Sequence, residues 1–207
     1  MALATYGDLK TSVAAWLARA DLTSTIPDFV TLAHKQLMCD LRGHIRLQKR
    51  DTAFSVSGEF VAAPTDFLEL VSMYINTSPK TAVTFLPSDQ MAPFVTSGTP
   101  VYVSIVGATT PGTEVFRFAP PPQSSTTATI EYYSTITFFA SDGATNWILT
   151  DHPQLYLYGS LLQASAYIGD DPRIPLWQAA YSEALMAVKK EGNRARWGGN
   201  SMAVRAT

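Results

Sequence analysis

Three histidines are the side chains in this 207-residue chain best suited to acid–base chemistry near neutral pH. His34 falls in a helical pattern beside Lys35, without a histidine or glutamate four residues away, which is typical of a surface or helix-packing residue. His152 stands between Asp151 and Pro153, as expected in a helix cap. A hydrolase using His152 would need a nearby serine, and the chain has no G-x-S-x-G elbow or other nucleophile motif. We therefore predict no enzymatic activity and no catalytic residue.

Two carboxylate pairs and one cysteine are the other candidates for chemistry. Asp66 and Glu69 flank a predicted strand entry, and Asp170 and Asp171 precede a proline in the manner of a helix cap. The single Cys39 excludes an internal disulfide framework and a Cys-rich zinc site, and a buried thiol is expected. Glycine-rich phosphate loops are also missing. The sequence thus predicts neither a metal nor a cofactor.

Two basic clusters are better suited to contacting partners. The last 19 residues carry five Lys/Arg and one Glu, and apolar residues follow a Gly-Gly break at 198–199. A solvated helix end would explain the charge, but an apolar and basic tail favours docking into a partner groove. The predicted docking residues are Arg194, Arg196, Trp197, Met202, Val204 and Arg205. The second cluster, predicted to face DNA in a channel or a partner, comprises Arg42, Arg46, Lys49 and Arg50.

Composition narrows the class of protein. Apolar residues make up 46% of the chain and charged residues only 15%, against about 25% in ordinary soluble domains, so we expect partners to cover part of the surface. The net charge of −2 gives no overall basic footprint for nucleic acid. The segment 151–170 is apolar but carries polar residues, and 89–114 is broken by prolines, so we predict no membrane span. The first ten residues do not resemble a secretory signal.

Charge and periodicity divide the chain into three parts. Residues 1–50 carry a net charge of +3, residues 51–150 carry −6 and residues 151–207 carry +1. Helical stripes occur in the first part (9–17 and 26–41) and in the last part (153–168 and 177–188). The middle part is rich in Thr, Ser and Pro and predicts five or six short strands: 52–56, 67–75, 101–106, 115–118 and 127–133.

These patterns predict an α+β protein in which helical hairpins from both ends form an antiparallel four-helix bundle, with a small antiparallel β domain inserted between the two hairpins. The predicted parts are an N-terminal hairpin (1–44), the β domain (45–140), a C-terminal hairpin (141–195) and a tail (196–207). The third helix is apolar on most sides and has surface to spare for a neighbouring copy. The predicted subunit-interface residues are Leu157, Tyr158, Leu161 and Tyr167.

With these segments in place, the chain resembles the head-to-tail adaptor (connector) proteins of tailed bacteriophages, of the type common in short-tailed phages. The resemblance lies in the order and spacing of several short motifs along almost the whole chain. In chain order they are WLARADL (16–22), IPDF (26–29), APTDFLEL (63–70), FRFAP (116–120), EYY (131–133), NWIL (146–149) and LYLYG (155–159).

The resemblance implies a structural protein of the virion neck, assembled in the bacterial host cytoplasm. It would form a homo-oligomeric ring, typically of twelve copies, beneath the portal protein. Such a ring extends the DNA ejection channel, lets double-stranded DNA pass without sequence readout, and presents a surface to the next tail component, a nozzle or tail tube. The basic tail that ends at residue 207 would then reach the portal.

An alternative of a different class stays open at this point. The Thr/Ser-rich β domain could bind a ligand such as a glycan, with the helices as a scaffold. Exposed aromatic residues gathered on the sheet would favour it, and the candidates are Tyr102, Tyr132 and Tyr133.

Overall fold

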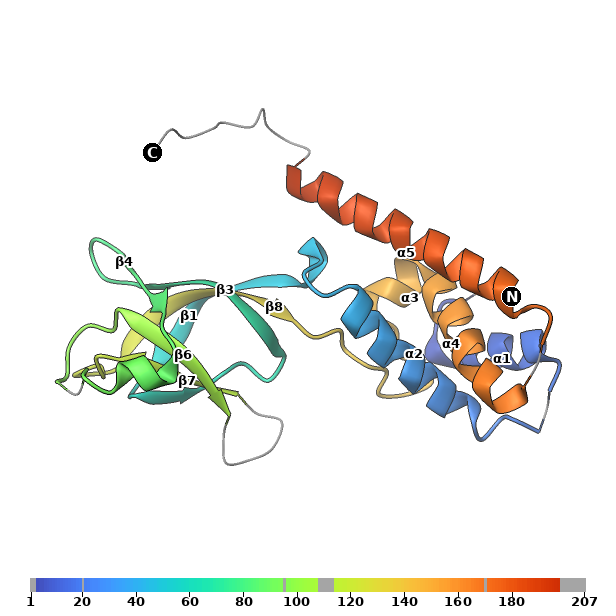
Figure 1. The fold of residues 1–207 in the computed structure, drawn as a ribbon, viewed down its shortest axis with the longest axis horizontal. Coiled ribbons are helices and arrows are strands. Elements are labelled where there is room, and N and C mark those ends of the chain that lie inside the picture. The colour runs from blue at the N-terminus through green and yellow to red at the C-terminus, as the bar shows by residue number, and fades with distance from the viewer. Residues whose placement is uncertain (1–2, 20, 95, 108–113, 170, 198–207) are drawn as a thin grey trace. The chain divides into compact units, whose positions relative to one another are not determined.

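The computed structural model describes residues 3–19, 21–94, 96–107, 114–169 and 171–197 (Figure 1). The chain divides into two compact units. Unit 1 consists of Met1–Ile45 together with Ile136–Thr207, and unit 2 is Arg46–Thr135. Unit 1 is helical and unit 2 is built from strands, with the short helix η1 (Ile45–Leu47) where the chain passes from one to the other.

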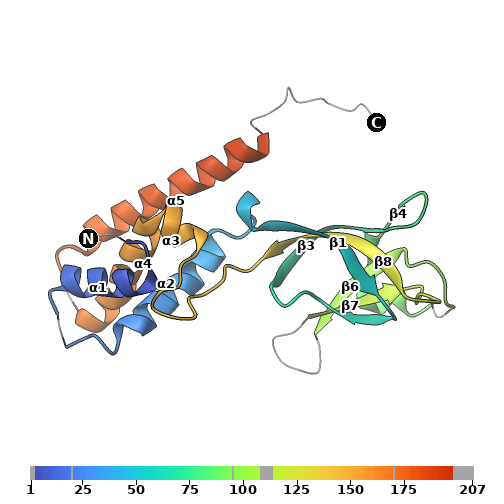
Figure 2. The same ribbon diagram turned by 180° about the vertical axis from the view of Figure 1, so that it is seen from behind.

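Unit 1 is organised around one central helix. Its helices are α1 (Tyr6–Leu17), α2 (Ile26–Asp40), α3 (Trp147–Asp151), α4 (Pro153–Ile168) and α5 (Ile174–Trp197). The other four all pack against α4, and both views show α4 between α2 and α5 (Figures 1 and 2). Leu155, Tyr156 and Leu161 are fully buried on α4, which agrees with a helix that is apolar on most sides.

Local signals explain where α1 begins and which face it buries. Thr5 Oγ1 accepts a hydrogen bond from Asp8 N (3.2 Å) and Asp8 Oδ2 accepts one from Thr5 N (3.1 Å), which forms the predicted capping box. Leu9, Val13 and Leu17 then form the buried stripe. The helix therefore starts at its cap and turns its apolar side to α4.

The prediction of an antiparallel four-helix bundle with a small β insert is wrong. The described residues form five α-helices, because Asn146 Oδ1 accepts from Leu149 N (3.0 Å) and starts the separate short helix α3. His152 ends α3, and Pro153, which has no N–H to donate, starts α4. The other helices of unit 1 thus all pack on α4.

Unit 2 contains two four-stranded sheets where a small antiparallel β domain of five or six strands was expected. One has the order β1-β8-β3-β4 and the other β2-β7-β6-β5. The β5–β6 pair is parallel and the other pairs are antiparallel, so the second sheet is mixed. The strands are β1 (Gln48–Val56), β2 (Phe60–Ala62), β3 (Phe67–Ile75), β4 (Thr81–Ala82), β5 (Thr84–Phe85), β6 (Tyr102–Gly107), β7 (Glu114–Ala119) and β8 (Thr126–Ser134).

Unit 2 has its own aromatic-rich core. The rings of Phe67 and Phe116 meet edge to face with centroids 5.0 Å apart, and Phe118 and Tyr132 extend the cluster. Such pairs stabilise beyond their buried area. The other buried members of this core are Val56, Met73, Ile75, Val103, Ala128 and Ile130.

Candidate partner-binding surface at the end of helix α5

Helix α5 carries the basic cluster that the sequence assigned to docking. The helical stripe predicted for this part of the chain ends at residue 188, whereas the helix continues to Trp197. Arg194 and Arg196 lie on its last turns, and both are exposed. Met202, Val204 and Arg205 lie outside the described residues.

Position 192 inside α5 requires glycine, because the packing there leaves no room for a side chain. A Cβ on Gly192 would come within 2.4 Å of His44 Nε2 and 2.6 Å of His44 Cδ2. His44 is buried, and its Nε2–H donates to the Val188 carbonyl oxygen (3.2 Å). Glycine inside a helix costs about 1 kcal/mol relative to alanine, and here that cost is offset by the close approach of an imidazole.

An aromatic stack supports His44 from the other side. The His44 ring lies on the indole of Trp147 with centroids 5.5 Å apart and 17° between the planes. His152 meets the same indole edge-on, and its Nε2 lies 3.3 Å from Glu191 Oε2. That separation allows an ion pair when His152 is protonated, although the geometry is not that of a hydrogen bond. Residues from the turn after α2, from α3 and from the junction between α3 and α4 thus hold the end of α5 in place.

A pocket of about 240 Å³ opens where the chain leaves α2 beside the end of α5. Gly43, at a φ of +79°, makes the left-handed turn that returns the backbone toward α5. Arg196 Nη2 donates to the Gly43 carbonyl oxygen (3.4 Å). The lining residues are Asp40, Leu41, Arg42, Gly43, His44, Ile45, Lys189, Gly192, Asn193 and Arg196.

The pocket is predominantly cationic. Arg42, Lys189 and Arg196 line it, and Asp40 is the acidic residue among the lining side chains. Asp40 Oδ2 accepts from the Tyr181 hydroxyl (2.7 Å), and its Oδ1 accepts from Gln36 Nε2 (3.1 Å). Burial and the adjacent Asp40 carboxylate raise the pKa of Tyr181, so the hydroxyl stays a donor. Arg42 and Arg196, which the sequence assigned to different clusters, thus line the same pocket.

The rest of the second basic cluster belongs to unit 2. Lys49 forms an ion pair with Asp66, and Arg50 Nε lies 3.6 Å from Glu131 Oε1. Arg46 is exposed. Since unit 2 carboxylates engage Lys49 and Arg50 on their own sheet, these two cations are partly neutralised within the chain.

The four predicted subunit-interface residues are in different environments. Leu157 and Leu161 are buried inside unit 1, so their side chains offer no surface. Tyr158 is half-buried against Trp16, with ring centroids 5.8 Å apart. Tyr167 is 63% exposed. The tyrosines, and not the leucines, therefore present the outer surface of α4.

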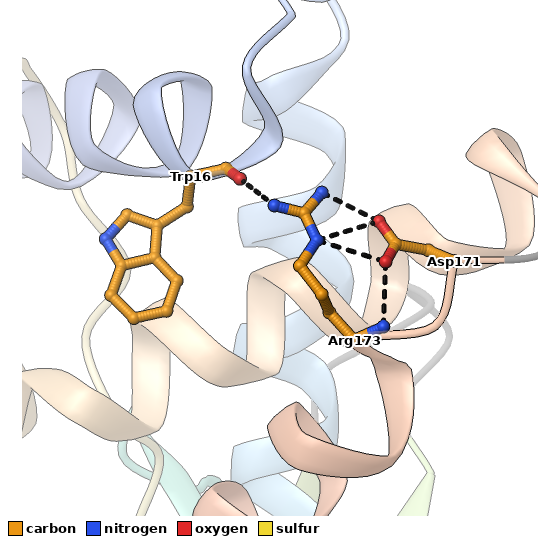
Figure 3. Close-up of polar contacts among 3 residues, drawn as sticks. All are labelled: Trp16, Asp171 and Arg173. Carbon is orange, nitrogen blue, oxygen red and sulfur yellow. Dashed lines mark hydrogen bonds and ion pairs between the residues drawn. The ribbon is translucent and has the colours of Figure 1, made fainter.

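An arginine clasp, formed by Arg173, joins the end of α1 to the start of α5. Arg173 Nη1 donates to the carbonyl oxygen of Trp16 (2.8 Å), and its Nε and Nη2 donate to the Asp171 carboxylate (Figure 3). Hydrogen bonds and charge from Arg173 lower the pKa of Asp171. Asp171 Oδ1 also accepts from the Arg173 backbone N–H (2.8 Å), which sets the turn before α5.

Asp66 and Asp171, two of the carboxylates considered for catalysis, form ion pairs and hydrogen bonds that stabilise the fold. The side-chain bonds from Lys49 and Tyr132 outweigh burial and lower the pKa of Asp66. A general acid needs a raised pKa, so lowered values at Asp66 and Asp171 do not fit that task. Asp170 lies outside the described residues. Among those described, no group of three His, Cys, Asp or Glu side chains forms a potential metal site.

The aromatic residues proposed for glycan binding do not form an exposed patch. Tyr132 is buried, and its hydroxyl donates to Asp66 Oδ1 (3.1 Å). Tyr133 is half-buried, and half-buried Tyr102 packs on Phe94 with centroids 4.9 Å apart. The observation that would have favoured the glycan hypothesis is therefore missing for these residues.

One signal for this surface was present in the sequence. A glycine inside an otherwise helical stretch, as at Gly192, often marks a close packing contact. The partner, His44, could not be identified from the sequence because it lies 148 positions away in the chain. No helix in the described part of the chain is both long and apolar enough to cross a bilayer.

Comparison with known proteins settles the family. A search of curated proteins gives no match. The family model described as SU10 adaptor protein matches residues 4–205, which run through both units. This match confirms the resemblance to adaptor proteins that the ordered motifs indicated. The chain therefore belongs to the SU10 adaptor protein family.

Proposed function

We propose that the chain is a structural head-to-tail adaptor of a tailed bacteriophage, located in the virion neck and assembled in the host cytoplasm. The observation that carries the proposal is the family match over residues 4–205. The match includes the helical unit, the β unit and the basic end of α5. A protein that joins a phage head to a tail needs separate surfaces for its different partners, and the helical unit, the β unit and the basic end of α5 can provide them.

In the proposed assembly, copies of the chain form a ring, typically of twelve, beneath the portal protein. Exposed apolar side chains on unit 1 support contacts between copies, since such groups gain by leaving water. They include Tyr167, Leu176 on α5 and Leu32 on α2, which are 63%, 67% and 51% exposed. In this arrangement Tyr158 and Tyr167 contact a neighbouring copy, and the buried Leu157 and Leu161 shape the helix behind them.

The end of α5 and the tail at 196–207 reach the portal in this proposal, and unit 2 faces outward or toward the next tail component, a nozzle or tail tube. The exposed Arg194 and Arg196 support this assignment of the basic end. In this proposal double-stranded DNA passes through the channel of the ring without sequence readout. The neutralised Lys49 and Arg50 favour passage over tight binding, because phosphate affinity rises with each available cation.

The test is a truncation that removes residues 194–207. The truncated chain keeps Gly192 and His44, so we expect a folded protein that loses only the helical signal of residues 194–197 at 222 nm and fails to join DNA-filled heads. A matched chain lacking only 201–207 retains the whole of α5 and measures how much of the loss belongs to the tail. Normal attachment of tails by the chain lacking 194–207 would refute the docking assignment.

A further inference from the structure

We infer that the pocket between the end of α2 and the end of α5 is a socket for a carboxylate side chain of the protein to which the adaptor docks. The inference rests on the proposed function for the identity of the partner. The location of the site and the chemistry of its ligand are inferred from the structure alone. The pocket is defined by the ten lining residues given above and holds about 240 Å³.

The first argument is charge. Three cationic side chains, from Arg42, Lys189 and Arg196, line one cavity in a chain whose net charge is −2. Carboxylates form their strongest bonds with such charged donors, and a guanidinium can bind both carboxylate oxygens at once. Asp40 accepts hydrogen bonds at both of its oxygens from Tyr181 and Gln36, which ties its carboxylate to the wall.

The second argument is pre-organisation. The floor of the pocket is held by buried His44, which is fixed between Trp147 and the Val188 carbonyl oxygen. Arg196 is oriented by its bond to the carbonyl oxygen of Gly43. A site whose groups are already in position loses less conformational entropy when a ligand enters. Asn193, whose side chain carries an amide donor, is also among the lining residues.

The third argument distinguishes an acidic side chain from DNA. The cations gather around one concavity, which suits a single carboxylate projecting from a protein. A nucleic-acid backbone instead needs cations spaced along a groove that follows the strand. The structure therefore favours an acidic protein segment, and DNA binding in the pocket becomes an outcome that the test can detect.

The experiment uses the purified full-length chain, a hexaglutamate peptide and a 12-base-pair duplex at 0.15 M salt. Amide NMR signals of Gly43, His44 and Gly192 report on the pocket. We expect the peptide to shift these signals, and Lys189→Glu to weaken binding at least about tenfold, the size of a lost charge-assisted bond. Arg42→Gln, on the opposite wall, tests the same site through a second variant.

Lys190→Glu is the matched control, because this exposed neighbour makes the same change of charge but does not line the pocket. We expect it to weaken peptide binding less than about threefold. Equal losses for both lysine variants, or stronger shifts of the pocket signals with the duplex than with the peptide, would overturn the inference.

Head joining is measured separately, so that the two ideas fail separately. A wild-type chain that joins heads but does not respond to the peptide refutes the socket and leaves the adaptor function standing. Conversely, a chain that binds the peptide through Lys189 but is absent from virions refutes the adaptor function alone.

Discussion

The contact between Gly192 and His44 allows a quantitative test of how α5 is held. Gly192 does not adopt the left-handed backbone, so Gly192→Ala introduces no backbone strain. In a helix interior the change should stabilise by about 1 kcal/mol. Its new Cβ, however, would lie 2.4 Å from His44 Nε2, and such overpacking costs about 1–3 kcal/mol in a tight core.

We therefore expect Gly192→Ala to destabilise the wild-type chain by up to about 2 kcal/mol and to stabilise a His44→Ala chain by about 1 kcal/mol. The difference between the two effects, about 1–3 kcal/mol, is the coupling between the two positions. Urea unfolding followed at 222 nm measures it, because the helices lie in unit 1. The same effect of Gly192→Ala in both backgrounds, within about 0.5 kcal/mol, would refute the packing account.

Three further predictions concern other contacts of unit 1. Gly159→Val should destabilise by about 2 kcal/mol or more in urea unfolding, because even a Cβ there lies 3.3 Å from side chains of α2 and α5. Burial and nearby Lys35 lower the pKa of His34, so the unfolded chain binds its proton more readily. Wild-type stability should therefore fall as the pH drops below about 7, and His34→Gln should flatten that dependence in thermal unfolding. Arg173→Ala should speed amide hydrogen exchange in the first turn of α5, and unchanged exchange would mean that the clasp to the Trp16 carbonyl has no effect there.

The helices of this protein were largely predictable because their signals are local. The capping box of Thr5 and Asp8 and the apolar stripe through Leu9 and Val13 lie within a few turns of one another. Strand β3 (Phe67–Ile75) also has the predicted bounds, since prolines and glycines mark the turns around it. The sequence pattern is sufficient to predict an element whose ends are set by residues within or next to that element.

The errors arose where strands are very short, where two caps follow closely, or where contacts between distant segments decide the structure. Strands β2, β4 and β5 have only two or three residues, too few for a recognisable alternation, and the partner of β2 is β7, more than fifty residues away in the chain. Helix α3 was missed because Asp151 and Pro153 look like one cap, although Asn146 starts an earlier helix. The cationic pocket could not be predicted, because Arg42 and Arg196 are 154 positions apart and meet only through folding.

The pairing of β1 with β8 has a consequence for how this protein could diversify. Gln48 and Tyr133 are partners in that ladder, so the entrance and exit of unit 2 are neighbouring strands about 5 Å apart. If unit 2 were removed, the helical unit would need to bridge only the distance between two neighbouring strands. The ninety residues of Arg46–Thr135 could therefore be exchanged as a cassette for another module, or closed by a short turn, without extending the host backbone. Recombination at this junction would give related proteins different β modules in the same helical unit.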